Sequence, residues 1–436
     1  MNIIQASIPL FFLLIVAELL WSWRRGQRVA RLNDSIADIS CGVMSQMAGI
    51  FDKALTLGVF IWIGAHASIQ RWLPAIPHWP DRTPFPAGSG PLGVSLDVAA
   101  LASWAITFFL VDFCYYWSHR LSHEVHVLWA GHVVHHQSEE YNLAVALRQA
   151  TLGKLLTWIF YVPLAFIGIP WRLFVATYGV NLVYQFVLHT RTIGTLGPVV
   201  ERIMNTPSHH RVHHGVNPQY QDRNYAGVFI IFDRWFGTFE KEVEPVVYGV
   251  TKPLTSWNPV TANLQVFSQI WHDVRRATSW HERWHIVFGH PGWRPAASQP
   301  PAEPPRVTAT PSLTYDPPVP TPLAIYGFAQ MVLATGAAVM LLGKAKALPV
   351  GQASAAAFLI VVSLVGVAGV FERAQWVRPM EGARLLTIAM LGVALAVLVP
   401  SYAIVGWLAL GIAIVSGAVI WRYRDSFTEV ALAPVM

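Results

Sequence analysis

Residues 111–136 read VDFCYYWSHRLSHEVHVLWAGHVVHH and place two histidine motifs directly after an apolar run. The first motif is HRLSH at 119–123, and the second is HVVHH at 132–136. A third motif, HRVHH, follows at 210–214 with the spacing of the second. In an α-helix, residues three or four positions apart lie on one face with Cβ atoms about 5 to 6 Å apart. The spacing therefore predicts helical segments whose imidazoles converge on a common point.

The composition around these motifs is that of a membrane protein. The chain has 436 residues, of which 54% are hydrophobic and only 12% are charged, which is too apolar for an ordinary soluble enzyme. Several continuous apolar runs are long enough, or nearly so, to cross a hydrocarbon core of about 30 Å as helices rather than as barrel strands. The runs are 3–23, about 43–72, 98–117, 322–343, 355–371 and 402–420.

Arginines predict the orientation of the chain in the membrane. Four of them directly follow the first apolar run, which we interpret as a retained anchor, and they predict a cytoplasmic loop and an outside N-terminus. They are Arg24, Arg25, Arg28 and Arg31. Counting crossings from there brings the first histidine motif to the cytoplasmic face. The segment 155–188 is broken at GIPWR, so we expect a hairpin that returns His189 and the third motif to the same level.

A proline-rich stretch, SQPPAEPPRVTATPSLTYDPPVPTP at 298–322, divides the chain because its prolines lack amide donors. The fold class that we predict is an all-α, polytopic membrane helical bundle with a histidine-rich two-metal site at the cytoplasmic face. Its last region shows no cluster of chemically capable side chains, and we expect its arginines, including Arg384, at the lipid surface. The expected parts are N-terminal anchor helices at 1–95, a domain with the three motifs at 96–290, a linker at 291–321 and a four-helix region at 322–436.

The three motifs together supply more histidines than one metal ion needs, and this number predicts two ions. The eight candidates are His119, His123, His132, His135, His136, His210, His213 and His214. So many imidazoles near an apolar phase would be poorly satisfied without metal. His189, at a helix end, is a ninth candidate, whereas His209 points about 100° away from its neighbour His210 and is left out. Imidazole suits iron, zinc and copper, so the spacing does not choose the metal.

Other patterns are weaker. His281 and His285 have ligand spacing but no third partner, which favours a surface helix. HEVH at 123–126 is one residue short of the zinc-protease signature and argues against a metalloprotease. From another class, the chain could be a non-catalytic membrane protein that binds or transports metal. A transporter would spread its ligands along a pore, whereas these histidines cluster at one face, which disfavours transport. The basic residues are accounted for by anionic lipid and require no nucleic acid.

The order HxxxH, HxxHH, HxxHH across apolar segments resembles the fatty acid hydroxylase and sterol desaturase superfamily of membrane di-iron oxygenases. Within it, residues 111–149 and 205–240 resemble the alkylglycerol monooxygenase family. The resemblance implies that the motif histidines hold two iron ions, with zinc possible in the isolated protein. It also implies a lipid substrate, dioxygen and reduced tetrahydrobiopterin as electron donor, with cleavage of an ether lipid to a fatty aldehyde. Because the motifs do not name the lipid, a sterol or fatty acyl hydroxylase or a desaturase stays open.

Four further residues are candidates for the site. The resemblance implies that Glu124, directly after the first motif, binds pterin or orders a ligand. Asp112 lies seven residues before His119 on the same helical stripe and is expected to accept a hydrogen bond from a ligand's second ring nitrogen. Arg148 and Gln149 would meet a head group or the pterin, although a polar loop capping the next helix is an equal reading.

The membrane would be the inner or plasma membrane in a bacterium and the endoplasmic reticulum in a eukaryote.

Overall fold

The computed structural model describes residues 3–86, 95–295 and 314–427, and within these ranges the fold is helical without any strand. Among the described residues, seven helices are long and apolar enough to cross a membrane. They are α1 (Ile3–Arg24), α2 (Leu32–His66), α4 (Val98–Glu124), α15 (Thr321–Lys344), α16 (Val350–Glu372), α17 (Val377–Leu398) and α18 (Ala403–Arg422). The predicted all-α, polytopic membrane fold is confirmed. Four of the six predicted runs fall within these helices, whereas the run 43–72 extends past the end of α2 and the run 402–420 begins one residue before α18.

The contacts divide the chain into two compact units. The first unit contains residues 1–31, 51–253 and 263–310, and the second contains 32–50, 254–262 and 311–436. Most of the predicted linker, residues 296–313, lies outside the described residues. The division of the sequence into four parts therefore stays a prediction.

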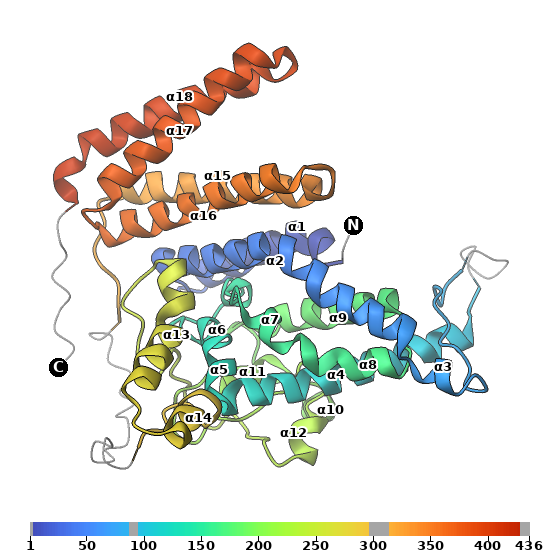
Figure 1. The fold of residues 1–436 in the computed structure, drawn as a ribbon. Helices are drawn as coiled ribbons and strands as arrows, with labels where there is room; N and C mark the ends of the chain where they lie inside the picture. Colours follow the sequence, from blue (N-terminus) through green and yellow to red (C-terminus); the bar gives the residue numbers. More distant parts are fainter. Residues whose placement is uncertain (1–2, 87–94, 296–313, 428–436) are drawn as a thin grey trace. The chain divides into compact units, whose positions relative to one another are not determined.

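In the first unit, the long helix α4 packs against α9 (Trp171–Phe186), and α9 packs against α1 (Figure 1). Helix α4 begins where the Asp97 carboxylate accepts a hydrogen bond from the backbone amide of Ala100 at 3.0 Å. It then runs without interruption to Glu124, so the first histidine motif forms its last turns.

The predicted break at GIPWR is present between α8 (Val162–Phe166) and α9. Gly168 adopts a φ of +80°, which favours glycine, and a Cβ atom there would overlap the side chain of Gln70. Pro170 then precedes the first turn of α9. Residues before the break form α3 (Ile69–Trp72) and α7 (Gly153–Thr157).

Short helices carry the second and third histidine motifs. The second motif lies on α6 (Val133–His136) and the third on α11 (Pro207–His213), which has its proline at the first helical turn. The other short helices of this unit are α5 (His126–Ala130), α10 (Pro198–Ile203), α12 (Ile231–Trp235) and α14 (Trp280–Phe288). The longer helix α13 (Pro259–Arg276) begins in the second unit and continues in the first from residue 263. The spanning helices thus position the motifs, but only the first motif lies on one.

In the second unit, α15 packs on α16 and α17 packs on α18. The structure corrects one expectation here, because Arg384 is only 5% exposed and does not lie at a lipid surface. Its guanidinium forms an ion pair with Glu381 at 2.7 Å inside the bundle. The sequence analysis missed this cluster because it counted arginines without asking which face of α17 each one occupies.

Candidate metal centre

Nine imidazoles from distant parts of the sequence gather in two groups. Within each group, one ring nitrogen from every histidine lies within 4.8 Å of those of the others. The five-histidine group contains His119, His123, His132, His136 and His213, and the four-histidine group contains His135, His189, His210 and His214. All nine predicted ligands are therefore brought together, whereas their role as ligands is a proposal taken up below.

The closest approaches between ring nitrogens fit ions shared by several histidines. The Nε2 atom of His132 lies 3.0 Å from Nε2 of His119 and 3.1 Å from Nε2 of His136. In the four-histidine group, Nε2 of His189 lies 3.1 Å from Nε2 of His135. Two nitrogens bound at right angles, each about 2.1 Å from an ion, are about 3.0 Å apart. The observed separations match that value.

Several ring nitrogens at the centre have no hydrogen-bond partner. The Nε2 atoms of His123, His213 and His214 are buried and unpaired. A buried polar atom without a partner costs about 1–3 kcal/mol, so native proteins rarely keep several of them together. Metal ions would satisfy these nitrogens, and the residues present therefore fit a metal centre.

Backbone carbonyls orient four of the rings from the opposite side. In each, the Nδ1 atom lies 2.7 to 3.1 Å from a carbonyl oxygen, which accepts its proton and leaves Nε2 free for the centre. The pairs are His119 with Tyr225, His135 with Arg148, His189 with Gln185 and His213 with Arg223. This arrangement fixes the tautomer that can offer a lone pair to a metal.

Burial also keeps the imidazoles uncharged. Desolvation lowers the pKa of His135 to about 4, and it lowers the pKa values of His136 and His213 well below the usual range. These rings are therefore neutral at pH 7, the protonation state that a metal ligand requires.

Asp112 influences the histidines indirectly, through hydrogen bonds to a neighbouring helix and a loop. Its carboxylate accepts hydrogen bonds from Asn181 Nδ2 at 2.7 Å and from the backbone amides of Val228 and Phe229 at 2.9 and 2.8 Å. These partners differ from the expected one, a ring nitrogen of a ligand. The sequence placed Asp112 on the correct stripe of α4 but could not show that a loop from residues 225–229 would fill the space.

A second buried carboxylate holds the same loop. Asp233 accepts hydrogen bonds from the backbone amides of Tyr225 and Ala226 at 2.7 and 2.9 Å and from the Thr238 hydroxyl at 2.7 Å. Asp112 and Asp233 together fix the loop whose Tyr225 carbonyl oxygen faces His119. They are positioning residues for a ring of the five-histidine group.

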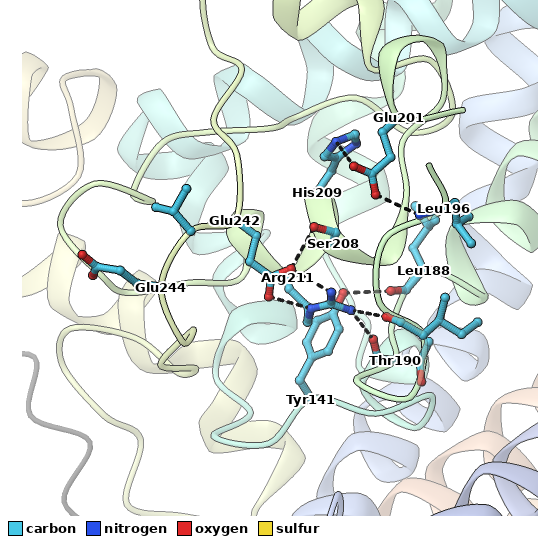
Figure 2. A network of polar contacts seen from close by, with 12 residues as sticks. Tyr141, Leu188, Thr190, Leu196, Glu201, Ser208, His209, Arg211, Glu242 and Glu244 are labelled. Carbon is cyan, nitrogen blue, oxygen red and sulfur yellow. Dashed lines mark hydrogen bonds and ion pairs between the residues drawn. The ribbon is translucent and has the colours of Figure 1, made fainter. Parts of the chain in front are cut away.

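Arg211, which lies within the third motif, links that motif to neighbouring segments through its guanidinium (Figure 2). Its guanidinium pairs with both carboxylate oxygens of Glu242, at 2.8 and 2.7 Å. It also donates to the carbonyl oxygens of Thr190 and Ile193, at 3.0 and 2.7 Å. One side chain thereby joins α11 to the segment that follows His189, so two of the three chain segments that supply the four-histidine group are held together.

The remaining histidines of the sequence patterns lie outside both groups. His209 is buried beside Glu201, with Nε2 4.0 Å from the carboxylate (Figure 2). Its ring also meets that of Phe239 edge-on. His281 and His285 lie against each other on α14, with ring centroids 4.1 Å apart. The sequence analysis left out these three residues, and the structure places none of them with the nine.

A cavity of about 320 Å³ opens beside the histidines. Its lining includes histidines of both groups, several apolar side chains and a set of polar residues. The polar residues include Asp222, Lys252, Gln265, Gln269 and His290. The sequence analysis missed these residues, although Gln265 and Gln269 lie four positions apart on one face of α13, a spacing that could have indicated them.

The predicted cofactor-binding residues do not line this cavity. Glu124 is partly exposed and pairs with Arg120 Nε at 2.9 Å. Arg148 is buried, and it donates from Nε to the carbonyl oxygen of Val134 at 2.6 Å, within the second motif. Gln149 donates to the carbonyl oxygen of Ala146 at 3.0 Å. Neither of these contacts caps the next helix, α7, and a role of Arg148 or Gln149 toward a head group or the pterin stays a prediction.

Comparisons with known proteins agree with this geometry. Residues 104–238, which contain all three motifs, match the fatty acid hydroxylase family. The chain is 40% identical to the human alkylglycerol monooxygenase over 293 residues, which are 67% of this chain and 60% of that protein. It is also 27% identical to an ornithine lipid hydroxylase of Rhizobium tropici over 144 residues, 31% of this chain and 41% of that protein. No solved structure matches the chain significantly.

A further relative decides the family. The alkylglycerol monooxygenase of Xenopus tropicalis is 37% identical over 332 residues, which are 76% of this chain and 68% of that protein. Alignments with the curated relatives thus span between 60% and 68% of the human and frog proteins. The match includes the segments with the histidine motifs and covers most of both chains in the frog comparison. The chain therefore belongs to the alkylglycerol monooxygenase family.

Proposed function

We propose that this protein is a membrane di-iron monooxygenase that cleaves the ether bond of alkylglycerols. In the reaction, one atom of dioxygen enters the carbon–hydrogen bond of the alkyl carbon next to the ether oxygen, and the other leaves as water with two electrons and two protons from a reductant. The hemiacetal then collapses to a fatty aldehyde and a glycerol derivative. The observation that carries the proposal is the pair of histidine groups with unpaired buried nitrogens.

The nine histidines would hold two iron ions, which supply the redox chemistry that acid and base side chains lack. The chain's own contribution is positioning. Backbone carbonyls turn the ring nitrogens toward the centre, and burial keeps the rings neutral. Asp112 and Asp233 hold the loop behind His119.

Polar reactants would reach the centre through the cavity bordered by Gln265 and Gln269. The polar residues of its lining suit a lipid head group or a water-soluble electron donor, for which we propose reduced tetrahydrobiopterin. Glu124 follows His123 at the end of α4 and does not line this cavity, so its proposed part in binding that donor is supported by the family resemblance alone. Arg148 we assign to bracing the second motif, because its guanidinium and carbonyl groups both contact that motif.

The site would face the cytoplasm. Four arginines follow α1, and basic residues concentrate on the cytoplasmic side of membrane proteins. The C-terminal end of α1 and the C-terminal end of α4 would then lie at that side, where an alkyl tail enters from the bilayer and the electron donor enters from water.

The test measures fatty aldehyde released from a 1-O-alkylglycerol by membranes that contain the protein. Iron and oxygen are present, and samples with and without tetrahydrobiopterin are compared. We expect pterin-dependent aldehyde that disappears in His135→Ala and persists in His281→Ala, a matched histidine outside both groups. Iron-loaded protein that releases no aldehyde with intact pterin would sink the ether-lipid assignment, and a hydroxylase or desaturase acting on another lipid would replace it.

A further inference from the structure

Helices α13 and α14 expose large aromatic side chains although neither qualifies as a membrane span. Trp271 on α13 is 60% exposed, and Trp280, Trp284 and Phe288 on α14 are 81%, 62% and 47% exposed. Contiguous exposed apolar surface of this kind marks a site of protein or membrane contact. The question is which of these partners the residues around it indicate.

The exposed aromatic residues of α14 form one stripe. Trp280, Trp284 and Phe288 are four positions apart, and the rings of the last two lie with centroids 4.3 Å apart. The opposite face of α14 is already covered, since Ile286 packs with Ile270 and other apolar residues of the first unit. The helix is therefore amphipathic, with its inner face covered and its aromatic face open.

Hydrogen bonds fix the level of α14 along a spanning helix. The backbone amide of His126 donates to the carbonyl oxygen of Gly289 at 2.9 Å, and its Nδ1 atom lies 2.8 Å from the carbonyl oxygen of Ile286. His126 is two residues beyond Glu124, where α4 ends. The C-terminal end of α14 thus lies beside the C-terminal end of α4, beyond the apolar run 98–117. Figure 1 shows α13 running steeply across the direction of α4.

The charges beside the aromatic residues are mainly positive. The guanidinium of Arg283 lies 5.1 Å from the ring centre of Trp280, and that of Arg275 lies 5.8 Å from the ring centre of Trp271. Arg276 adds a third cation at the end of α13. Asp273 and Glu282 are the acidic residues of the two helices, and Glu282 is engaged in hydrogen bonds from Thr278.

We infer that α14 and the last turns of α13 lie in the head-group layer of the bilayer that α4 crosses, and that this layer contains anionic lipid. Tryptophan prefers this layer, and arginine beside an apolar stripe attracts acidic head groups. The inference does not depend on the reaction proposed above. It has a consequence for the site. Because α13 carries Gln265 and His290 follows α14, the lipid contact borders the cavity beside the histidines.

The test is a cysteine scan of residues 280–288 in the full chain. Cys41 and Cys114 are replaced by alanine, one cysteine at a time carries a fluorophore, and the protein is placed in phosphatidylcholine vesicles that contain phosphatidylserine. Quenching by brominated lipid tails is compared with quenching by iodide in the water. We expect several-fold stronger lipid quenching at 280, 284 and 288 than at 281, which is the matched exposed position on another face.

Each other pattern would overturn the inference. Iodide quenching at all exposed positions would show a water-facing helix, and weak quenching by both agents at the aromatic stripe would show a protein partner or a second copy. A second arm replaces Arg275, Arg276 and Arg283 by glutamine. We expect this change to remove the difference in lipid quenching between vesicles with and without phosphatidylserine, and an unchanged difference would exclude the anionic lipid. Unchanged iron content and thermal melting identify the folded variants.

Discussion

Two regions of this molecule bury polar side chains, and they differ in whether the buried polar atoms have hydrogen-bond partners. In the second unit, Arg384 donates to Glu381, Gln330 and Ser363, at 2.7, 2.9 and 3.3 Å, while Tyr326 donates to Glu381 at 2.5 Å. Within the described residues, none of these side chains has an unpaired buried polar atom. At the candidate metal centre, in contrast, His123, His213 and His214 keep such atoms.

The difference distinguishes a structural network from a site that needs a ligand. A buried network whose members satisfy one another rigidifies a bundle, and nothing needs to be added to it. A buried cluster whose atoms converge without partners is stable only when something else completes it. The predictions below measure these two properties separately, as metal binding on one side and stability on the other.

The largest effect should come from removing one ligand from each histidine group. We expect His213→Ala and His210→Ala each to lower the iron content from two ions per chain toward one and to abolish turnover, because a group that loses a nitrogen no longer completes its coordination. Metal analysis of the purified variants provides the measurement. His209→Ala, on the same helix and buried but outside both groups, should keep both ions. Equal iron content in all three variants would contradict the grouping.

The second effect concerns stability alone. Arg384→Met leaves the Glu381 carboxylate buried without its cation, and breaking a buried ion pair in this way costs about 3–5 kcal/mol. We expect a lower thermal midpoint in detergent and an unchanged iron content in the protein that remains folded. The double variant Glu381→Met/Arg384→Met should recover most of the loss, since no charge is left unpaired.

The exposed Arg378 lies on the same helix and provides the control for the second prediction. Arg378→Met should melt like the unmodified protein. If Arg384→Met lost iron as well as stability, the C-terminal bundle would take part in holding the metal centre, and the separation between the two regions would fail.

A third, smaller effect tests positioning. Asp233→Asn should weaken hydrogen bonding to the backbone amides of Tyr225 and Ala226, and so loosen the carbonyl that orients His119. Changes behind metal ligands typically cost 10- to 100-fold in metal affinity, and we expect about that loss in iron affinity. Competition with a chelator measures it. A melting point that falls while iron affinity stays unchanged would reduce Asp233 to a purely structural residue.

The sequence predicted much of this molecule because its strongest signals are local. Apolar length predicted the spanning helices, Gly168 and Pro170 predicted the break before α9, and the spacing of histidines predicted which imidazoles would meet. His189 could be included because a helix end at the right level is visible in the sequence. Each of these inferences needs only one segment and its period.

The sequence failed where the answer depends on a partner from elsewhere in the chain. The acceptors of the ring protons are backbone carbonyls, which every residue has, so the Tyr225 carbonyl could not be singled out. Arg384 reads as a surface arginine until its helix is placed against Tyr326 and Gln330. Asp112 occupies the expected stripe but meets a loop instead of a ligand. Such contacts depend on how segments pack, which spacing does not encode.

The smallest expected effect concerns a buried carboxylate of the first unit whose oxygens both have partners. Glu18 on α1 is buried, and its carboxylate accepts hydrogen bonds from the Leu143 backbone amide at 2.7 Å and from the Thr190 hydroxyl. It is fully paired like the Arg384 network, although Thr190 directly follows His189. Glu18→Gln keeps the shape and one acceptor, so we expect a loss of about 1 kcal/mol in stability and little change in iron affinity. If iron affinity fell as far as in Asp233→Asn, complete pairing would no longer separate structural polar groups from those that serve the metal centre. Helix α1 would then have to be counted among the elements that position the four-histidine group.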